Sequence, residues 1–297
     1  MTTTKMTCPA CEGGDFARIV DLKAMVLDRC RQCGLVINSP QSVLGAKDYY
    51  GENYDGLYEN YYKNFRRRQF HDVFQRLAKL TFPGQRVLDI GCSYGWFLDA
   101  AKAHGFQAVG AEPSKIAFDR LKSDPEKVVF NCGIEGIPLI DGVFDLVTMW
   151  NVFEHLAEPM AALTQVRDKL KDDGVVLLCV PDVSGLITRL SFLAYAASFG
   201  LVNRHLLGLY QMDNDFPHLF HYSKRPLEMI LRKSGFEPIA SWQQDIIDGQ
   251  NLGERISGYA GVKTPLKYAL VAALGATQKF ARLIGRQDEL VVVARKV

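Results

Sequence analysis

Short apolar runs alternate with longer, mixed segments along most of the chain from residue 86 onward. The runs are short enough for buried strands, and the segments between them have the length of helices. The predicted strands cover residues 86–91, 106–114, 127–133, 144–151 and 175–181. The predicted helices cover residues 92–105, 115–124 and 160–174, the last of them closed by Gly174. This alternation predicts an α/β fold, with a parallel sheet, helices on both faces and a ligand crevice at the carboxyl ends of the strands.

Four of the seven cysteines form two close pairs near the N-terminus, Cys8 with Cys11 and Cys30 with Cys33. Eighteen residues separate the two pairs, a spacing typical of a tetrahedral structural zinc site. Apolar segments at 17–22 and 34–39 are expected to form hairpin strands, and residues 1–44 are predicted to be a zinc ribbon. Two separate redox pairs remain the alternative.

An aromatic-rich stretch follows at residues 45–82, and its second half repeats apolar positions at helical spacing. It is expected to be a linker and a helix, with Tyr49 and Tyr54 as candidates to cap a ligand cleft. Arg66–Arg68 are expected on a solvated face, with phosphate contact as the alternative. The remaining residues, 83–297, are predicted to be one α/β domain with helical insertions at about 184–215 and 250–286.

Composition narrows the class of protein. The formal charge of +2 argues against a protein that depends on bulk affinity for nucleic acid. The longest apolar run, near residues 190–202, is too short for a spanning helix, and the first residues hold no secretory signal. Seven cysteines without a secretory signal indicate a reducing compartment, so the protein is expected to be cytoplasmic, with peripheral membrane contact still open. The sequence favours no oligomeric state.

The first strand ends in a glycine turn, DIGCSYG, and the second strand ends in Glu112. An acid at that position can accept hydrogen bonds from both hydroxyls of a ribose. A dinucleotide fingerprint starting at Gly91 would need glycines where Ser93 and Trp96 stand, and the chain has no GKS or GKT phosphate loop. The predicted ligand is therefore a nucleoside without phosphates.

The stretch VLDIGCSYGWFLDAAKAHGFQAVGAEPS resembles the nucleoside-binding half of class I S-adenosylmethionine-dependent methyltransferases. Matches continue in order to about residue 182, and residues 216–239 are similar to the broad methyltransferase 23 group. The closing DELVVVARKV resembles the family's antiparallel last strand. The resemblance implies a Rossmann-like, seven-stranded, mostly parallel sheet and S-adenosylmethionine as cofactor, with S-adenosylhomocysteine as product.

The same resemblance implies roles for single residues. Asp89 and Gly91 would lie along the methionine part of the cofactor, Glu112 would hold the ribose, Ile134 would present backbone near the adenine, and Asn151 would close the fourth-strand side. The rest of the implied cofactor set is Cys92, Ser93, Tyr94, Gly95 and Pro113. The chain departs from the family at Gly133, where an acid often contacts the adenine amino group.

A four-cysteine module ahead of such a domain also resembles the zinc-containing methyltransferases that act on deoxysugars. This chain lacks their long extra C-terminal domain, and the acid expected before His218 is replaced by Pro217. These departures favour methylation of oxygen over carbon.

A hydroxyl acceptor needs a general base, and histidine is the natural choice near neutral pH. His155 lies just beyond the fourth strand, beside Glu154, which could orient or polarise it. His218 lies in the loop after the fifth strand, where the family places groups that face the acceptor. Either histidine, or both, is the expected base.

Two segments hint at the acceptor. Residues 184–212 are apolar and contain Arg189 and Arg204 but no acid, and residues 255–287 carry six basic residues and no acid. They predict a helical lid or a basic, apolar cover for a lipid-linked or anionic acceptor. The preferred hypothesis is an O-methyltransferase for a sugar or a lipid-linked saccharide. The alternatives are a C-methyltransferase of a nucleotide deoxysugar, an RNA base methyltransferase and a catalytically silent scaffold that binds nucleoside.

Overall fold

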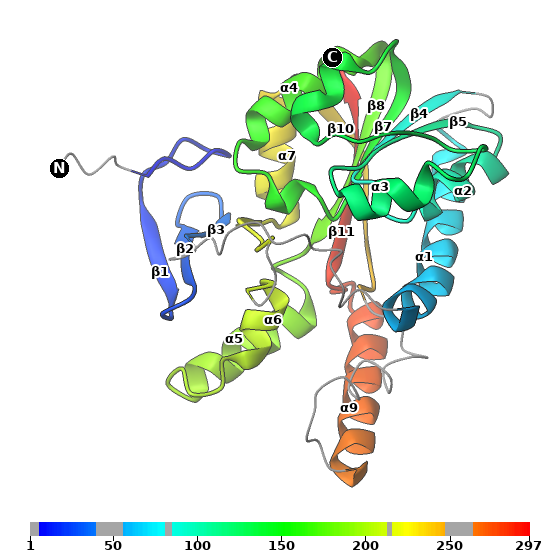
Figure 1. Cartoon of the computed structure of the whole chain (residues 1–297). Coiled ribbons are helices and arrows are strands. Elements are labelled where there is room, and N and C mark those ends of the chain that lie inside the picture. The colour runs from blue at the N-terminus through cyan, green and yellow to red at the C-terminus, as the bar shows by residue number, and fades with distance from the viewer. Residues whose placement is uncertain (1–5, 40–55, 81–84, 213–215, 247–263) are drawn as a thin grey trace.

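The computed structural model describes residues 6–39, 56–80, 85–212, 216–246 and 264–297. Within them, seven strands form a central sheet in the order β10-β11-β8-β7-β4-β5-β6 (Figure 1). The strands are β4 (Arg86–Ile90), β5 (Gln107–Ala111), β6 (Val128–Phe130), β7 (Phe144–Trp150), β8 (Leu170–Pro181), β10 (Phe236–Gln244) and β11 (Glu289–Lys296). β11 runs antiparallel to both of its neighbours, and the other pairs are parallel. The expected mostly parallel sheet with an antiparallel last strand is confirmed.

Helices cover both faces of this sheet because its central strands are apolar on both sides. On one face, α1 (Gly56–Leu77) and α2 (Trp96–Ala103) pack against alternate strand residues such as Val87 and Leu146. On the other face, α4 (Pro159–Lys169) and α7 (Lys224–Lys233) pack against the next residues along, such as Leu88 and Val147 (Figure 1). The shorter α3 (Lys115–Leu121) connects β5 to β6.

The four-cysteine region forms a small second sheet that is joined to the main domain. Its strands are β1 (Phe16–Asp21), β2 (Val26–Cys30), β3 (Val36–Asn38) and β9 (Phe220–His221), in that order. β9 comes from the other end of the sequence, and it pairs antiparallel with β3 so that Val36 faces His221. Leu35 and Ile37 belong to the same hydrophobic cluster as the α4 and α7 residues. The ribbon is therefore built into the fold rather than tethered to it.

Several predicted boundaries are wrong. The helix expected at 92–105 is α2, and it begins at Trp96 because residues 91–95 form the turn after β4. The helix expected to run to Gly174 ends at Lys169, because Leu170 is already extended and pairs with Phe144. Strands expected at 106–114 and 127–133 are shorter, and β2 lies in a stretch for which no strand was expected.

Two helical insertions leave the carboxyl edge of the sheet (Figure 1). The first holds α5 (Leu186–Ala197) and α6 (Arg204–Leu209), and the second holds α9 (Thr264–Leu283). Two 3-10 turns, Ile134–Leu139 and Phe153–His155, follow β6 and β7 at the same edge. In the described ranges no helix is long and apolar enough to cross a membrane. Tyr49 and Tyr54, the candidate cleft caps, lie outside the described residues.

Candidate active site

The turn after β4 has an unusual backbone that brings the main chain close to its surroundings. Gly91, Ser93 and Gly95 all have positive φ angles, of 75°, 49° and 73°. The N–H groups of Gly91 and Cys92 donate to the carbonyl of Ala111 at 2.7 and 3.1 Å, which ties the turn to β5. A Cβ atom on Gly91 would lie 2.4 Å from Cγ2 of Val152. Position 91 therefore requires glycine, both because its φ angle is positive and because Val152 fills the space that a Cβ atom would occupy.

Glu112 is buried and fixed at the end of β5. Its two carboxylate oxygens accept hydrogen bonds from the backbone N–H groups of Ser93, at 2.7 Å, and Ser114, at 2.8 Å. Each oxygen can accept a further hydrogen bond, so the carboxylate can still receive two hydroxyl groups. Beside it, Tyr94 stacks on Trp96 with ring centroids 5.0 Å apart, and Pro113 is exposed.

Asp89 lies beneath the turn, in the middle of the parallel strands. It is buried, and it accepts a 2.6 Å hydrogen bond from the hydroxyl of Thr148 on β7. Burial raises the pKa of Asp89 to about 7. This pair joins β4 to β7 and sets the position of the turn.

A carboxylate lies beside Gly133, the position at which the chain departs from the family's usual acid. Glu135, in the 3-10 turn that begins at Ile134, folds back and accepts a 3.2 Å hydrogen bond from the N–H of Gly133. A carboxylate therefore lies beside Gly133, although it comes from a position two residues later. The sequence feature that could have revealed this contact is an acid two residues after a glycine, because a carboxylate at that spacing can accept a hydrogen bond from the backbone N–H of the glycine.

Asn151 ends β7 with a positive φ angle of 54° and accepts a 2.8 Å hydrogen bond from Arg66. Arg66 also donates to the buried carboxylate of Glu289 at 3.2 Å. The expectation of a solvated face at Arg66–Arg68 is therefore wrong for Arg66. Its long side chain reaches from α1 to the sheet edge, where a buried carboxylate needs a cation.

Glu154, His155 and His218 come together at the same edge, as three groups whose ligand atoms lie within 4.8 Å of one another. Nε2 of His155 is 4.0 Å from a carboxyl oxygen of Glu154. Both carboxyl oxygens of Glu154 and Nε2 of His218 are buried and have no hydrogen-bond partner among the described residues. Buried polar atoms without partners are rare in folded proteins, so this cluster marks a place for a polar ligand.

Main-chain contacts from three segments hold these side chains. The ring Nδ1 of His155 lies 3.2 Å from the carbonyl of Pro217, so it donates there and leaves Nε2 as an acceptor. The side chain of Asn38, on the ribbon strand β3, donates to the carbonyl of His218 at 2.9 Å. The N–H of Leu219 donates to the carbonyl of Glu154 at 2.8 Å.

Burial sets the protonation of this cluster. It lowers the pKa of His155 to about 4 and that of His218 well below its ordinary value, and it raises the pKa of Glu154 to about 8. At neutral pH both imidazoles are therefore neutral and can accept a proton. Glu154 is protonated and can donate a hydrogen bond.

The four paired cysteines converge at one point of the ribbon. Sγ atoms lie 3.5 Å apart for Cys8 and Cys33 and 3.4 Å apart for Cys11 and Cys30, and all four lie within 4.8 Å of one another. Thiolates at the usual zinc–sulfur distance would be separated by about 3.8 Å in a tetrahedron. The arrangement fits a four-thiolate zinc site, and Gly34, directly after the second pair, has a positive φ angle of 86°.

Comparison with known proteins places this site in context. A family model described as a methyltransferase domain matches residues 62–241. The ubiquinone biosynthesis O-methyltransferase of Cereibacter sphaeroides is 32% identical over 105 residues, which are 34% of this chain and 42% of that protein. The chain therefore aligns with less than half the length of this curated relative.

Solved structures share the fold at low identity. A chain of the complex between the Trm112 methyltransferase activator and a methyltransferase of Haloferax volcanii superposes with a TM-score of 0.57 at 16% identity, over 85% of this chain and 99% of that chain. A SAM-dependent methyltransferase of Archaeoglobus fulgidus gives 0.50 at 18% identity, over 82% and 100%. These likenesses establish the architecture.

Replacement of Gly91 by alanine tests the turn. The Gly91→Ala protein is expected to fold but to lose at least tenfold in affinity for S-adenosylhomocysteine, because the new Cβ would clash with Val152 and disfavour the positive φ angle. Isothermal titration calorimetry measures the affinity. Gly285→Ala is the matched control, since Gly285 also has a positive φ but open space around it. Equal affinity in both variants would contradict the assignment.

Proposed function

The chain belongs to the methyltransferase domain family, and we propose that it is an S-adenosylmethionine-dependent O-methyltransferase acting on a hydroxyl group of a small-molecule acceptor. The observation that carries the proposal is the pairing of two sites on one sheet edge. One is the Gly91 turn with Glu112, which is shaped for a nucleoside. The other is the buried cluster of Glu154, His155 and His218, which offers unpartnered acceptors and a donor.

The residues present suit this cofactor. Glu112 is placed to accept the ribose hydroxyls while it keeps its two backbone donors, and the bare Cα of Gly91 lets Val152 pack against the turn that would lie along the methionine part. Glu135 offers a carboxylate for the adenine amino group, in place of the acid that Gly133 lacks. Asn151 closes the fourth-strand side through its bond to Arg66. When bound, the cofactor supplies an activated sulfonium methyl group.

The histidine cluster would prepare the acceptor oxygen. We place the acceptor hydroxyl between the three groups, with Nε2 of His218 taking its proton and protonated Glu154 donating a hydrogen bond to its oxygen. His155, whose Nε2 is an acceptor, lines the same cluster. The proton of the acceptor hydroxyl would then reside on His218, and the bound cofactor would supply the methyl group to the oxygen. Burial keeps water away from this step, which favours transfer over solvation of the nucleophile.

Oxygen is favoured over carbon by the missing acid before His218, and over other atoms by the O-methyltransferase relative. A sugar or lipid-linked saccharide is the preferred acceptor, on the partial sequence resemblance of the N-terminal four-cysteine module to zinc-containing sugar methyltransferases. An acceptor related to ubiquinone biosynthesis is the second candidate, supported by the name of the relative that is 32% identical over 105 residues.

A labelled-methyl screen tests the function. Purified protein and labelled S-adenosylmethionine are incubated with cell extract split into lipid, glycan, RNA and small-molecule pools. Label in the glycan or glycolipid pool supports a saccharide acceptor, and label in neutral lipid supports the second candidate. Label confined to RNA contradicts both, and the absence of transfer with intact cofactor binding indicates a silent scaffold.

The pH dependence of transfer follows from the buried cluster. Because the pKa of His155 is lowered to about 4, kcat/KM should stay level down to about pH 5 instead of falling near 6.5. Above about pH 8 the proton of Glu154 is lost and the rate should fall. His218→Ala should lower kcat by at least a hundredfold. Glu154→Gln should keep activity and remove the alkaline limb; an unchanged profile would show that Glu154 is only structural.

Zinc in the ribbon is part of the proposal, and its removal should reach the active site. We expect one zinc ion per chain, lost in Cys8→Ala and Cys30→Ala with a destabilisation of several kcal/mol. Because Asn38 holds the carbonyl of His218, metal loss should lower kcat while S-adenosylhomocysteine binding persists. Cys132→Ala, outside the cluster, is the control. Wild-type protein without zinc by metal analysis would refute the assignment.

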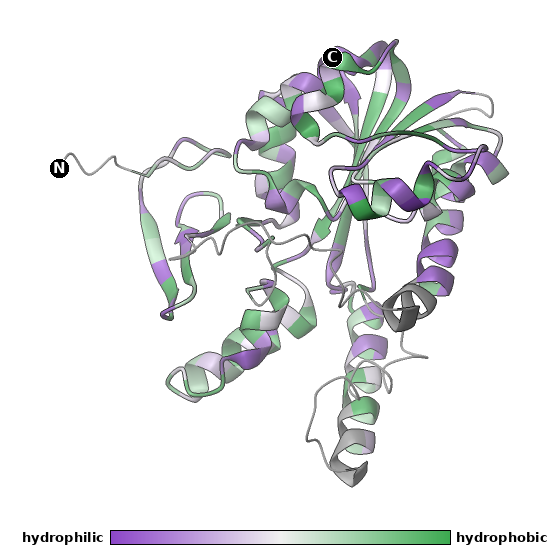
Figure 2. Ribbon diagram, in the orientation of Figure 1, coloured by the Kyte–Doolittle hydropathy of each residue, from purple (hydrophilic) through white to green (hydrophobic). Residues whose placement is uncertain are grey.

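Peripheral membrane contact is proposed for the loop between α5 and α6. Phe199 and Leu201 are 96% and 86% exposed there, Arg204 begins α6, and Arg189 lies farther back on α5. Figure 2 shows apolar positions along both helices. A projecting apolar tip with basic flanks suits an anionic bilayer surface.

Vesicle co-sedimentation tests this contact. Wild-type protein is expected to sediment with vesicles that contain anionic lipid at low salt, and Phe199→Ser/Leu201→Ser should reduce the bound fraction severalfold. Leu139→Ser, an equally exposed leucine elsewhere, is the control. Equal sedimentation of all three proteins, or no binding by wild type, would remove the membrane from the proposal.

A further inference from the structure

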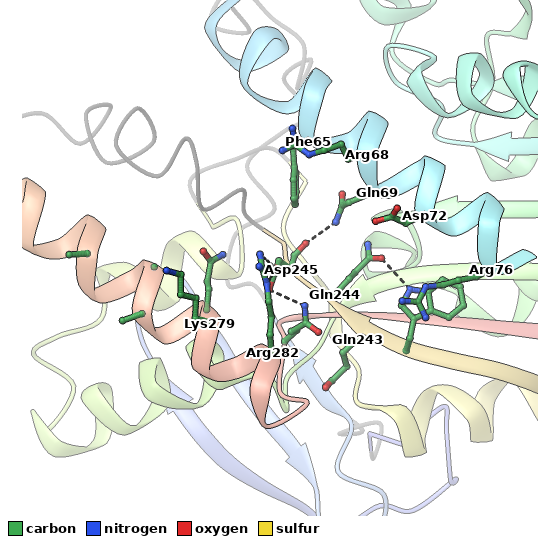
Figure 3. Close-up of a pocket in the computed structure, with 16 residues that line it drawn as sticks. Phe65, Arg68, Gln69, Asp72, Arg76, Gln243, Gln244, Asp245, Lys279 and Arg282 are labelled. Atoms are coloured by element: carbon green, nitrogen blue, oxygen red, sulfur yellow. Dashed lines mark hydrogen bonds and ion pairs between the residues drawn. The ribbon is translucent and has the colours of Figure 1, made fainter.

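A cavity of about 960 Å³ lies between α1, the end of β10 and α9, apart from the turn and the histidine cluster (Figure 3). Side chains from all three elements point into it. Its lining is largely polar and includes Arg68, Gln69, Asp72, Arg76, Trp242, Gln244, Asp245, Lys279 and Arg282. Ligand sites are typically cavities of this size with a few placed polar groups.

The cavity has an excess of positive charge. Its lining contains four cationic side chains but two carboxylates, those of Asp72 and Asp245. Asp245 is already engaged, because it forms an ion pair with Arg282 and accepts a hydrogen bond from Gln287. Among the described residues, no carboxylate lies within ion-pair distance of Arg76 or Lys279. Two cations thus face the cavity without a counter-charge.

One of these cations is held in place. The guanidinium of Arg76 lies over the ring of Trp242, 5.1 Å from its centroid. The indole N–H donates to Gln244 at 3.3 Å, which fixes the ring in turn. A guanidinium oriented this way loses less conformational freedom when it binds an oxyanion than a free surface arginine would.

The wall of the cavity is continuous with the active site. Gln69, on α1, accepts a 2.8 Å hydrogen bond from Arg66, and Arg66 donates to Asn151 at the end of β7. Gln69 and Gln244 also both donate to the carboxylate of Glu289, at 3.2 and 2.7 Å. A molecule in the cavity would therefore lie one layer of side chains from the cofactor side of β7.

We propose that this cavity binds an oxyanion group of the acceptor, a phosphate, diphosphate or carboxylate remote from the hydroxyl that receives the methyl group. Arg76, at one end of the cavity, is the main partner of that group, and Lys279 adds positive charge at the other end (Figure 3). The glutamines of the wall bind polar atoms between the group and the reacting end. The inference rests on the proposed function, since it names the chemical class of the acceptor.

Binding of inorganic pyrophosphate tests the cavity without knowledge of the acceptor. Calorimetric titration should show pyrophosphate binding to the wild-type protein, and Arg76→Glu and Lys279→Glu should each weaken it by at least tenfold. Lys224→Glu is the control for the same charge change, because Lys224 is also exposed, on α7, and lies outside the cavity. The fluorescence of Trp242 should change on binding, and Trp242→Phe should remove that change.

A parallel titration with S-adenosylhomocysteine separates the two proposals. All variants should bind it as the wild type does. If S-adenosylhomocysteine binds but pyrophosphate does not, or if pyrophosphate binds equally well to Arg76→Glu and Lys279→Glu, the cavity assignment is overturned and the methyltransferase proposal stands. If S-adenosylhomocysteine fails to bind, the proposed function itself fails.

The labelled-methyl screen supplies the link to the acceptor. The labelled product should bind to an anion exchanger, and pyrophosphate should inhibit its formation in the wild type but at least tenfold less effectively in Lys279→Glu. A neutral product that Lys279→Glu makes at the wild-type rate would overturn the proposal.

Discussion

The pairing of β3 with β9 is the contact on which the candidate active site depends. It joins strands almost two hundred residues apart in sequence, and Asn38 adds a side-chain hydrogen bond to the carbonyl of His218. The two carboxyl oxygens of Glu154 and Nε2 of His218 are buried without partners, and each would gain hydrogen bonds to water if it were exposed. Without the ribbon, these atoms would favour an open conformation of the loop that carries His218. The ribbon restrains that loop, so a structural metal in the ribbon would stabilise the neighbouring histidine cluster.

A second restraint acts from α1. Glu289 is fully buried at the sheet edge, and Arg66, Gln69 and Gln244 all donate to it. A buried carboxylate is tolerated only with such partners. The same arginine also donates to Asn151, which follows β7 with a positive φ angle. The cluster and the turn are thereby held from opposite sides of the sheet.

The sequence predicted what depends on local pattern and missed what depends on contacts across the chain. Alternating apolar runs predicted β4, β7 and β8, and the cysteine spacing predicted the convergence of four thiolates, because both follow from short-range geometry. β9 is two residues long and exists only because β3 lies beside it. Arg66 was expected in solvent, since nothing nearby in sequence reveals the buried Glu289 that it meets.

Burial gives the histidine cluster its shifted pKa values, and it also limits how strong a base the cluster can provide. His218, whose pKa burial lowers well below its ordinary value, is neutral at physiological pH, yet it is a weak base in its resting state. Proton transfer to it becomes favourable only when positive charge on the imidazole is stabilised as it forms. An anionic Glu154 would stabilise that charge, at the cost of a second buried anion beside Glu289. In the proposed reaction, the proton that the imidazole takes would come from the acceptor hydroxyl.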